Sequence, residues 1–153
     1  MKLEYIEPFV SSTLSVLKTV FQSDVEQGEI TLVRGRELAG DVSVIIGLHD
    51  HSGESVILNM DPATAMNICT AMNGVACGSA DPRGADTLGE LANMIAGNAV
   101  SALTEQGFSF AVRPPVIVGR GELPAITEGL ELFQVPVTSE YGDMTVNFTI
   151  RTT

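Results

Sequence analysis

Positively charged side chains are scarce in this sequence. Only 8 lysines and arginines stand against 19 aspartates and glutamates, which gives a formal net charge of −11 at pH 7. No cluster of basic residues interrupts this balance. Because an acidic surface repels the phosphates of nucleic acids, we expect no nucleic-acid partner. The acidic balance permits a partner with a cationic patch, although charge alone does not identify one.

Long apolar runs are also absent. No stretch approaches the roughly 20 apolar residues that a membrane span requires, so no membrane partner is expected. The opening residues, Met1 to Tyr5, include an acid and no apolar core of the kind that export signals carry. We therefore expect a cytoplasmic protein.

Cysteine is rare as well. Cys69 and Cys77 lie eight residues apart and form no CxxC pair. Without an export signal, they are expected to be reduced thiols, packed as small apolar groups. Cys69 shares an apolar helical face with Ala65, Ile68 and Met72, so we place it in the core.

The length and the apolar content indicate one globular unit. The chain has 153 residues, a usual size for one compact domain, and 44% of them are hydrophobic. A domain of this size buries roughly 70% of the surface of its unfolded chain, which is enough for a stable core. We assign residues 1–153 to a single domain.

Hydrophobic periodicity and turn residues predict three helices and a series of strands. Apolar residues recur every three or four positions in the helices, and Asp61-Pro62 has the composition of a helix start. The predicted helices span residues 4–21, 62–72 and 86–106. The predicted strands span residues 25–33 (interrupted by Gly28), 40–48, 55–60, 108–112, 115–118, 129–138 and 144–151.

The two halves of the chain resemble each other. Each runs from a helix into strands, and Val33-Arg34-Gly35 falls where Val118-Gly119-Arg120-Gly121 falls in the second half. We interpret this as an α-β-β-β unit used twice, with helix 62–72 between the copies. The predicted fold class is α+β, with a pseudo-twofold and one antiparallel-rich sheet on which the helices pack.

The helix predicted over residues 86–106 has an unusual polar face. Placed at 100° per residue, Asp86, Glu90, Asn93 and Gly97 form a single line opposite the apolar side. A merely solvated face favours Lys, Arg and Glu, whereas this one carries a poor helix former and glycine. Gly89 and Gly97 each cost about 0.5–1 kcal/mol relative to alanine. The apolar side consists of Leu88, Leu91, Ala92, Ile95, Ala99, Ala102 and Leu103.

Two interpretations of this face stay open on the residues alone. The glycines would let a partner come close, Glu90 would attract a cation, and the Asn93 carboxamide offers an acceptor and two donors at one point. This combination suits a helix that docks into another protein's site and holds a water. Alternatively, Glu-x-x-Asn is a common string, Asp86 is only a helix cap or first-turn acid, and Gly97 only eases packing.

The string from Asp86 to Ala99 resembles the CheC/CheX/FliY family of phosphatases. The family motif is Asp or Ser, three residues, Glu, two residues, Asn, and a proline a little over twenty residues later. Here Asp86, Glu90 and Asn93 are followed by Pro114-Pro115. The segment from Gly89 to Ala99 resembles CheX in particular. Two other segments also resemble CheX: the opening around Tyr5-Ile6 and Pro8-Phe9, and residues 40–48. The resemblance therefore covers nearly the whole chain.

The resemblance implies an activity and a division of roles. The substrate would be the aspartyl phosphate of a CheY-like response regulator, and the enzyme would be a hydrolase. Asn93 would orient the attacking water, and Glu90 would pair with the active-site lysine of the receiver domain. Asp86 and Gly97 would contact the substrate protein. No cofactor of its own is implied, because the receiver domain binds the divalent metal, expected to be Mg²⁺.

The resemblance also bears on assembly. Members of the CheC type carry a motif in each half, but here Glu7 is followed three residues later by Val10 instead of Asn. One motif per chain is the CheX pattern, which implies a homodimer. Two rival interpretations remain. One is a binding module of the flagellar-switch kind, which builds a ring and need not catalyse, and the other is an adaptor that holds a phosphorylated regulator without hydrolysing it.

Other signals are weaker. His49-x-His51 lies in a predicted hairpin turn and lacks a strong third ligand, so we predict no metal site there. Ser11-Ser12 and Ser101 lack the partners of a serine hydrolase. Gly119-Arg120-Gly121 does not open a helix, so it does not indicate a dinucleotide site.

Overall fold

The computed structural model describes residues 3–49, 54–76, 83–108, 111–119, 121–122 and 127–149. Three helices and eight strands form in these residues, together with one short 3-10 turn. Their bounds are α1 (Leu3–Phe21), β1 (Val25–Gln27), β2 (Thr31–Arg34), η1 (Gly35–Glu37), β3 (Val42–His49), β4 (Ser55–Met60), α2 (Pro62–Asn73), α3 (Arg83–Glu105), β5 (Ala111–Val112), β6 (Val116–Gly119), β7 (Glu131–Ser139) and β8 (Gly142–Thr149).

The helices form close to where the periodicity predicts them. α2 begins as expected: Asp61 is its N-cap and accepts a hydrogen bond of 2.7 Å from the backbone N–H of Thr64, while Pro62 occupies the first helical position. It ends at Gly74, whose φ of 72° is the left-handed conformation that glycine adopts without strain. α3 begins at Arg83, three residues before the predicted start.

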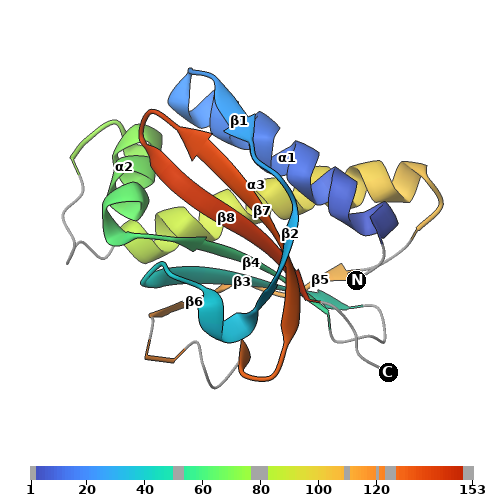
Figure 1. The fold of residues 1–153 in the computed structure, drawn as a ribbon. Coiled ribbons are helices and arrows are strands. Elements are labelled where there is room, and N and C mark those ends of the chain that lie inside the picture. The colour runs from blue at the N-terminus through green and yellow to red at the C-terminus, as the bar shows by residue number, and fades with distance from the viewer. Residues whose placement is uncertain are drawn as a thin grey trace.

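The eight strands form one antiparallel sheet. Its order is β1-β7-β8-β4-β3-β5, with β2 also paired to β7 and β6 also paired to β3. The three helices cover one face of this curled sheet, and η1, which follows β2, lies on the other side (Figure 1). The predicted α+β class with helices packed on an antiparallel sheet is therefore confirmed.

The strand count of the repeated unit needs correction. Among the described residues, each half contains a helix followed by four strands, because the edge strand is divided into β1 and β2 in one half and into β5 and β6 in the other. The divisions fall beside prolines, which have no N–H for a ladder hydrogen bond. Gly28 N–H donates to the Pro136 carbonyl at 2.8 Å where β1 ends. Pro114 and Pro115 separate β5 from β6.

The two halves are interlocked through these edge strands. β1 and β2 of the first half pair with β7 of the second, and β5 and β6 of the second half pair with β3 of the first. The β3–β4 and β7–β8 hairpins meet through β4 and β8 at the centre of the sheet. This reciprocal pairing is the pattern that a pseudo-twofold predicts.

The main core lies between the sheet and the helices. Phe9 of α1 and Phe148 of β8 are fully buried, and their rings meet edge to face with centroids 6.4 Å apart. A smaller apolar cluster on the other face contains Leu38, Ile57, Val118 and Leu132. The sheet on which α3 packs therefore has buried apolar side chains on both of its faces.

One expectation about the cysteines is wrong. Cys69 is buried, as its apolar face predicts, but it is disulfide-bonded and not a reduced thiol. Cys77 lies outside the described residues. An argument from cellular compartment cannot anticipate how close two cysteines lie in a fold. None of the helices that the structure describes is long and apolar enough to cross a membrane.

Candidate functional site

α3 presents its polar line to solvent because its other side is buried. The predicted apolar side packs into the core, with Ala102 only partly buried, and the structure adds Thr87 and Ala96 to the buried residues. The middle of α3 is also tied to α1, since the Ser12 hydroxyl donates a buried hydrogen bond of 2.6 Å to the Ile95 carbonyl. The rotation of α3 about its axis is thereby determined.

The structure brings all four predicted site residues to one exposed line. Asp86, Glu90, Asn93 and Gly97 are each exposed, and residues three or four apart on a helix have Cβ atoms about 5–6 Å from each other. Asp86 lies in the first turn of α3, where its charge is favourable with the helix dipole, and it is not the cap residue. Its place on the line remains compatible with contact to a partner.

The two glycines of α3 differ in their surroundings. A Cβ on Gly97 would meet no atom within 4 Å, so this position is open to an approaching molecule. A Cβ on Gly89 would lie 3.8 Å from the Cγ of Pro115, so this position is covered by the chain itself. Of the two, only Gly97 leaves free space for a partner.

A groove runs along one side of the exposed line. It has a volume of about 510 Å³, and α3 contributes Asn93, Ala96, Gly97 and Val100 to it, while residues 111–115 form the opposite wall. The prolines of the predicted motif therefore lie beside Asn93, although they are far from it in sequence. Sequence reasoning did not single out Arg113, the one charged residue of this wall; its position just before Pro114 was the available signal.

The first turns of α3 are held by the end of α2. The side-chain amide of Asn73 donates to the Thr87 hydroxyl at 2.8 Å and to the Cys69 carbonyl at 2.8 Å. Thr87 is buried directly after Asp86, so this link sets where the start of the polar line lies.

The structure also locates the weaker signals. His49 ends β3, and His51 lies outside the described residues. Within the described part of the chain, no three His, Cys, Asp or Glu side chains gather as a metal-ligand group. Gly119 ends β6, and Arg120 lies outside the described residues. In α1, Glu7 is exposed whereas Val10 is buried in the core.

The serines for which we predicted no hydrolase site lie together in a second groove, between α1 and α3. This groove has a volume of about 720 Å³ and is lined by Ser11, Ser12 and Ser101 among others. The Ser12 hydroxyl is engaged by the Ile95 carbonyl, and the described lining contains no histidine that could activate a serine.

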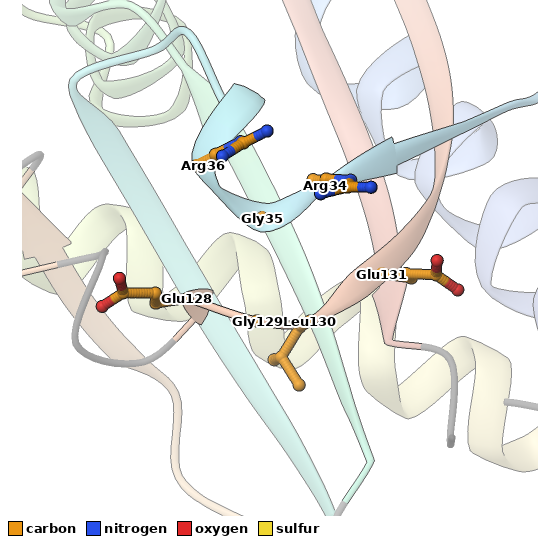
Figure 2. A pocket seen from close by; sticks show the side chains of 7 residues that line it. All are labelled: Arg34, Gly35, Arg36, Glu128, Gly129, Leu130 and Glu131. Carbon is orange, nitrogen blue, oxygen red and sulfur yellow. The ribbon is translucent and has the colours of Figure 1, made fainter. Parts of the chain in front are cut away.

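A third hollow lies on the other side of the sheet, between η1 and the start of β7. It has a volume of about 470 Å³ and is lined by Arg34 and Arg36 on one wall and by Glu128 and Glu131 on the other. The charged ends of these side chains do not converge on a common point (Figure 2). These four charged groups therefore do not form a binding site for a single ligand group.

Solved structures place this fold in one class. A CheC-like superfamily protein from Shewanella sp. PV-4 is 25% identical, with a TM-score of 0.82 over 99% of this chain and 100% of that one. The CheX of a CheX–CheY–BeF3–Mg²⁺ complex from Borrelia burgdorferi is 31% identical, with a TM-score of 0.81 over 99% of this chain and 100% of that one.

The family follows from the sequence match. The sequence model described as chemotaxis phosphatase CheX matches residues 42–138, which include the whole of α3. The CheY-P phosphatase CheX of Thermotoga maritima is 22% identical over 139 residues, covering 90% of this chain and 89% of that protein. The chain belongs to the CheX family of phosphatases, as its resemblance predicted.

Proposed function

We propose that this protein hydrolyses the aspartyl phosphate of a CheY-like receiver domain, which docks onto the exposed line of α3. The observation that carries the proposal is that Glu90 and Asn93 both stand exposed on α3, beside an open groove, in a chain of the CheX family. A relative of 31% identity is solved in complex with CheY, which supports a receiver domain as the partner.

The reaction needs a positioned water more than a new functional group. Water attacks the phosphorus in line, the bond from phosphorus to the aspartyl oxygen breaks, and the products are inorganic phosphate and a free carboxylate. In this proposal the receiver domain supplies its own divalent metal, Mg²⁺ or a similar ion, and its lysine. This protein contributes orientation of the water, which lowers the barrier by removing freedom of motion.

The roles of the two residues differ by chemistry. The Asn93 carboxamide can accept from and donate to a water at one point, but it is not a base. It therefore acts by holding the water in line, as the water-orienting glutamine of GTPases does. The Glu90 carboxylate, one turn away, pairs with the lysine of the receiver and sets how deeply α3 enters. Asp86 and Gly97 extend the contact.

The proposal is tested by following decay of a phosphorylated receiver with wild type, Asn93→Ala and Glu90→Ala. We expect Asn93→Ala to slow the chemical step by about a hundredfold, the order of the cost of misplacing a reacting group, with KM little changed. Glu90→Ala should mainly raise KM. Full acceleration by Asn93→Ala would contradict the mechanism.

The helix offers matched controls. Asn98 and Glu105 are exposed on α3 but line the groove toward α1 and not the one beside Asn93. Asn98→Ala and Glu105→Ala should therefore behave as wild type. Tight binding of the phosphorylated receiver without any acceleration by the wild type would instead support the adaptor interpretation.

We further propose that the protein acts as a homodimer in the cytoplasm, which would give two sites per assembly. Light scattering at micromolar concentration measures the molar mass in solution. A strict monomer would count against the proposed homodimer.

A further inference from the structure

Arg113 stands across the groove from Asn93 and is held in place by β3. Its backbone N–H donates to the Gly47 carbonyl at 2.8 Å, directly before Pro114. Its side chain lies over Gly47, since a Cβ on that glycine would come within 3.2 Å of the Arg113 Cδ. The residue is nevertheless exposed at the groove. The stem of the side chain is thus supported by β3 while the residue keeps access to solvent.

Opposite charges flank Asn93. On the helical wheel Asn93 leans toward the groove and residues 111–115, together with Ala96 and Val100, which also line it. Glu90 lies on the side of Asn93 that faces away from this groove, and it lines neither this groove nor the one toward α1. A partner seated over Asn93 therefore meets an anion on one side and a cation on the other.

We propose that Arg113 binds a carboxylate at the rim of the receiver's phosphorylation site, which makes it a second electrostatic contact of the docking surface. The inference rests on the function proposed above. In a chain with net charge −11, Arg113 is the one cation among the described residues that lines the groove beside Asn93. The guanidinium group binds carboxylates in a bidentate, planar manner.

A rim carboxylate is favoured over the phosphoryl group as the target. Asn93 occupies the approach to the phosphorus in the proposed mechanism, and Arg113 stands on the other wall of the groove. The two contacts of opposite sign, Glu90 to a lysine and Arg113 to an acid, fix how the receiver is rotated about α3. Partners with the reversed charge pattern would be rejected.

The test separates charge from packing. Arg113→Gln keeps most of the side-chain stem over Gly47 and removes the charge, whereas Arg113→Lys keeps the charge. As a control, Arg36→Gln removes a positive charge from η1, which lies on the far side of the sheet (Figure 1). Decay of the phosphorylated receiver is measured for each variant at low and raised salt, with thermal unfolding as a check of folding.

We expect Arg113→Gln to raise KM about three- to tenfold with kcat within about twofold, and to weaken the salt dependence of KM. Arg113→Lys should recover part of the loss, and Arg36→Gln should match wild type. Affinity for the unphosphorylated receiver should fall by the same factor, because the carboxylate is present in both forms.

Three outcomes overturn the assignment. If Arg113→Gln accelerates the decay as wild type does, with the same KM, the proposed role of Arg113 is rejected. The proposed function of the protein is then unaffected. A loss confined to the phosphorylated receiver rejects the carboxylate as the target. No acceleration by the wild type rejects the proposed function and this contact with it.

Discussion

The Cγ of Pro115 lies 3.8 Å from the point that a Cβ on Gly89 would occupy, so the motif proline packs against α3 beside the site. This contact joins two segments that are far apart in sequence, and it covers one glycine of the helix while Gly97 remains open. The groove that contains Asn93 is bounded by the same proline. The contact thus shapes the surface that a partner would meet.

The two glycines give the first prediction. Replacing either by alanine should raise the free energy of unfolding by about 0.5–1 kcal/mol, because alanine has less backbone freedom to lose in a helix. Gly89→Ala should keep full activity on a phosphorylated receiver, since its methyl group meets only Pro115 at van der Waals distance. Gly97→Ala should slow the decay, and Gly97→Leu should slow it further.

Urea denaturation and receiver decay, measured on the same preparations, check both effects. Equal activity of Gly97→Leu and wild type would show that no partner approaches at this position. A loss of activity in Gly89→Ala would show that the surface around Pro115 also takes part.

The helices and hairpins were predictable because their signals are local. The repeat of apolar residues every three or four positions placed α1, α2 and α3, and it placed Glu90 and Asn93 on the exposed side of α3. Asp61 and Gly74 marked the two ends of α2 through their capping chemistry.

The missed features depend on contacts between distant segments. Gly28 marks an interruption of the strand predicted over residues 25–33, but nothing near it indicates that the break lies opposite Pro136, more than a hundred residues away. The role of Gly47 as a support for Arg113 likewise requires the pairing of β5 with β3. The disulfide at Cys69 is a third case, because spacing alone does not fix the distance between two cysteines.

Ser12 gives a prediction about the support of α3. Its hydroxyl makes the buried bond to the Ile95 carbonyl, so Ser12→Ala should lower the free energy of unfolding by about 0.5–1.5 kcal/mol. Ser11, the neighbouring residue on α1, is exposed. Ser11→Ala should therefore change stability by less than about 0.5 kcal/mol. Urea denaturation of both variants measures the difference, and equal stabilities would mean that the bond contributes nothing.

Gly35 tests the closure of the sheet on the side away from the helices. A Cβ at this buried position would overlap the backbone carbonyl oxygen of Thr127, and a backbone group cannot move aside cheaply. Gly35→Ala should therefore destabilise the protein by about 1–3 kcal/mol. Gly121 matches it in the sequence of the second half, and a Cβ there would meet nothing within 4 Å. Gly121→Ala should be close to neutral, and similar melting temperatures for the two variants would contradict the predicted clash.

Asp61 links stability to pH. Hydrogen bonds from the backbone N–H and the hydroxyl of Thr64 hold the pKa of this carboxyl below its ordinary value of 3.8. Because the pKa is lower in the folded state than in the unfolded chain, the charged carboxylate stabilises the folded state at pH values above the ordinary pKa. That contribution is lost as the pH falls through the lowered pKa. Removing the cap with Asp61→Ala should cost about 1 kcal/mol at pH 7.

Asp61→Asn separates the charge from the cap. Asparagine is an equally good N-cap residue but does not titrate, so the variant should be nearly as stable as wild type at pH 7. Between about pH 5 and pH 3 the wild type should lose stability relative to Asp61→Asn, because only the wild-type cap becomes protonated. The other acidic residues titrate in both proteins, so the difference between the two urea midpoints isolates Asp61. A difference that stays constant over this range would show that the Thr64 hydrogen bonds do not favour the charged form.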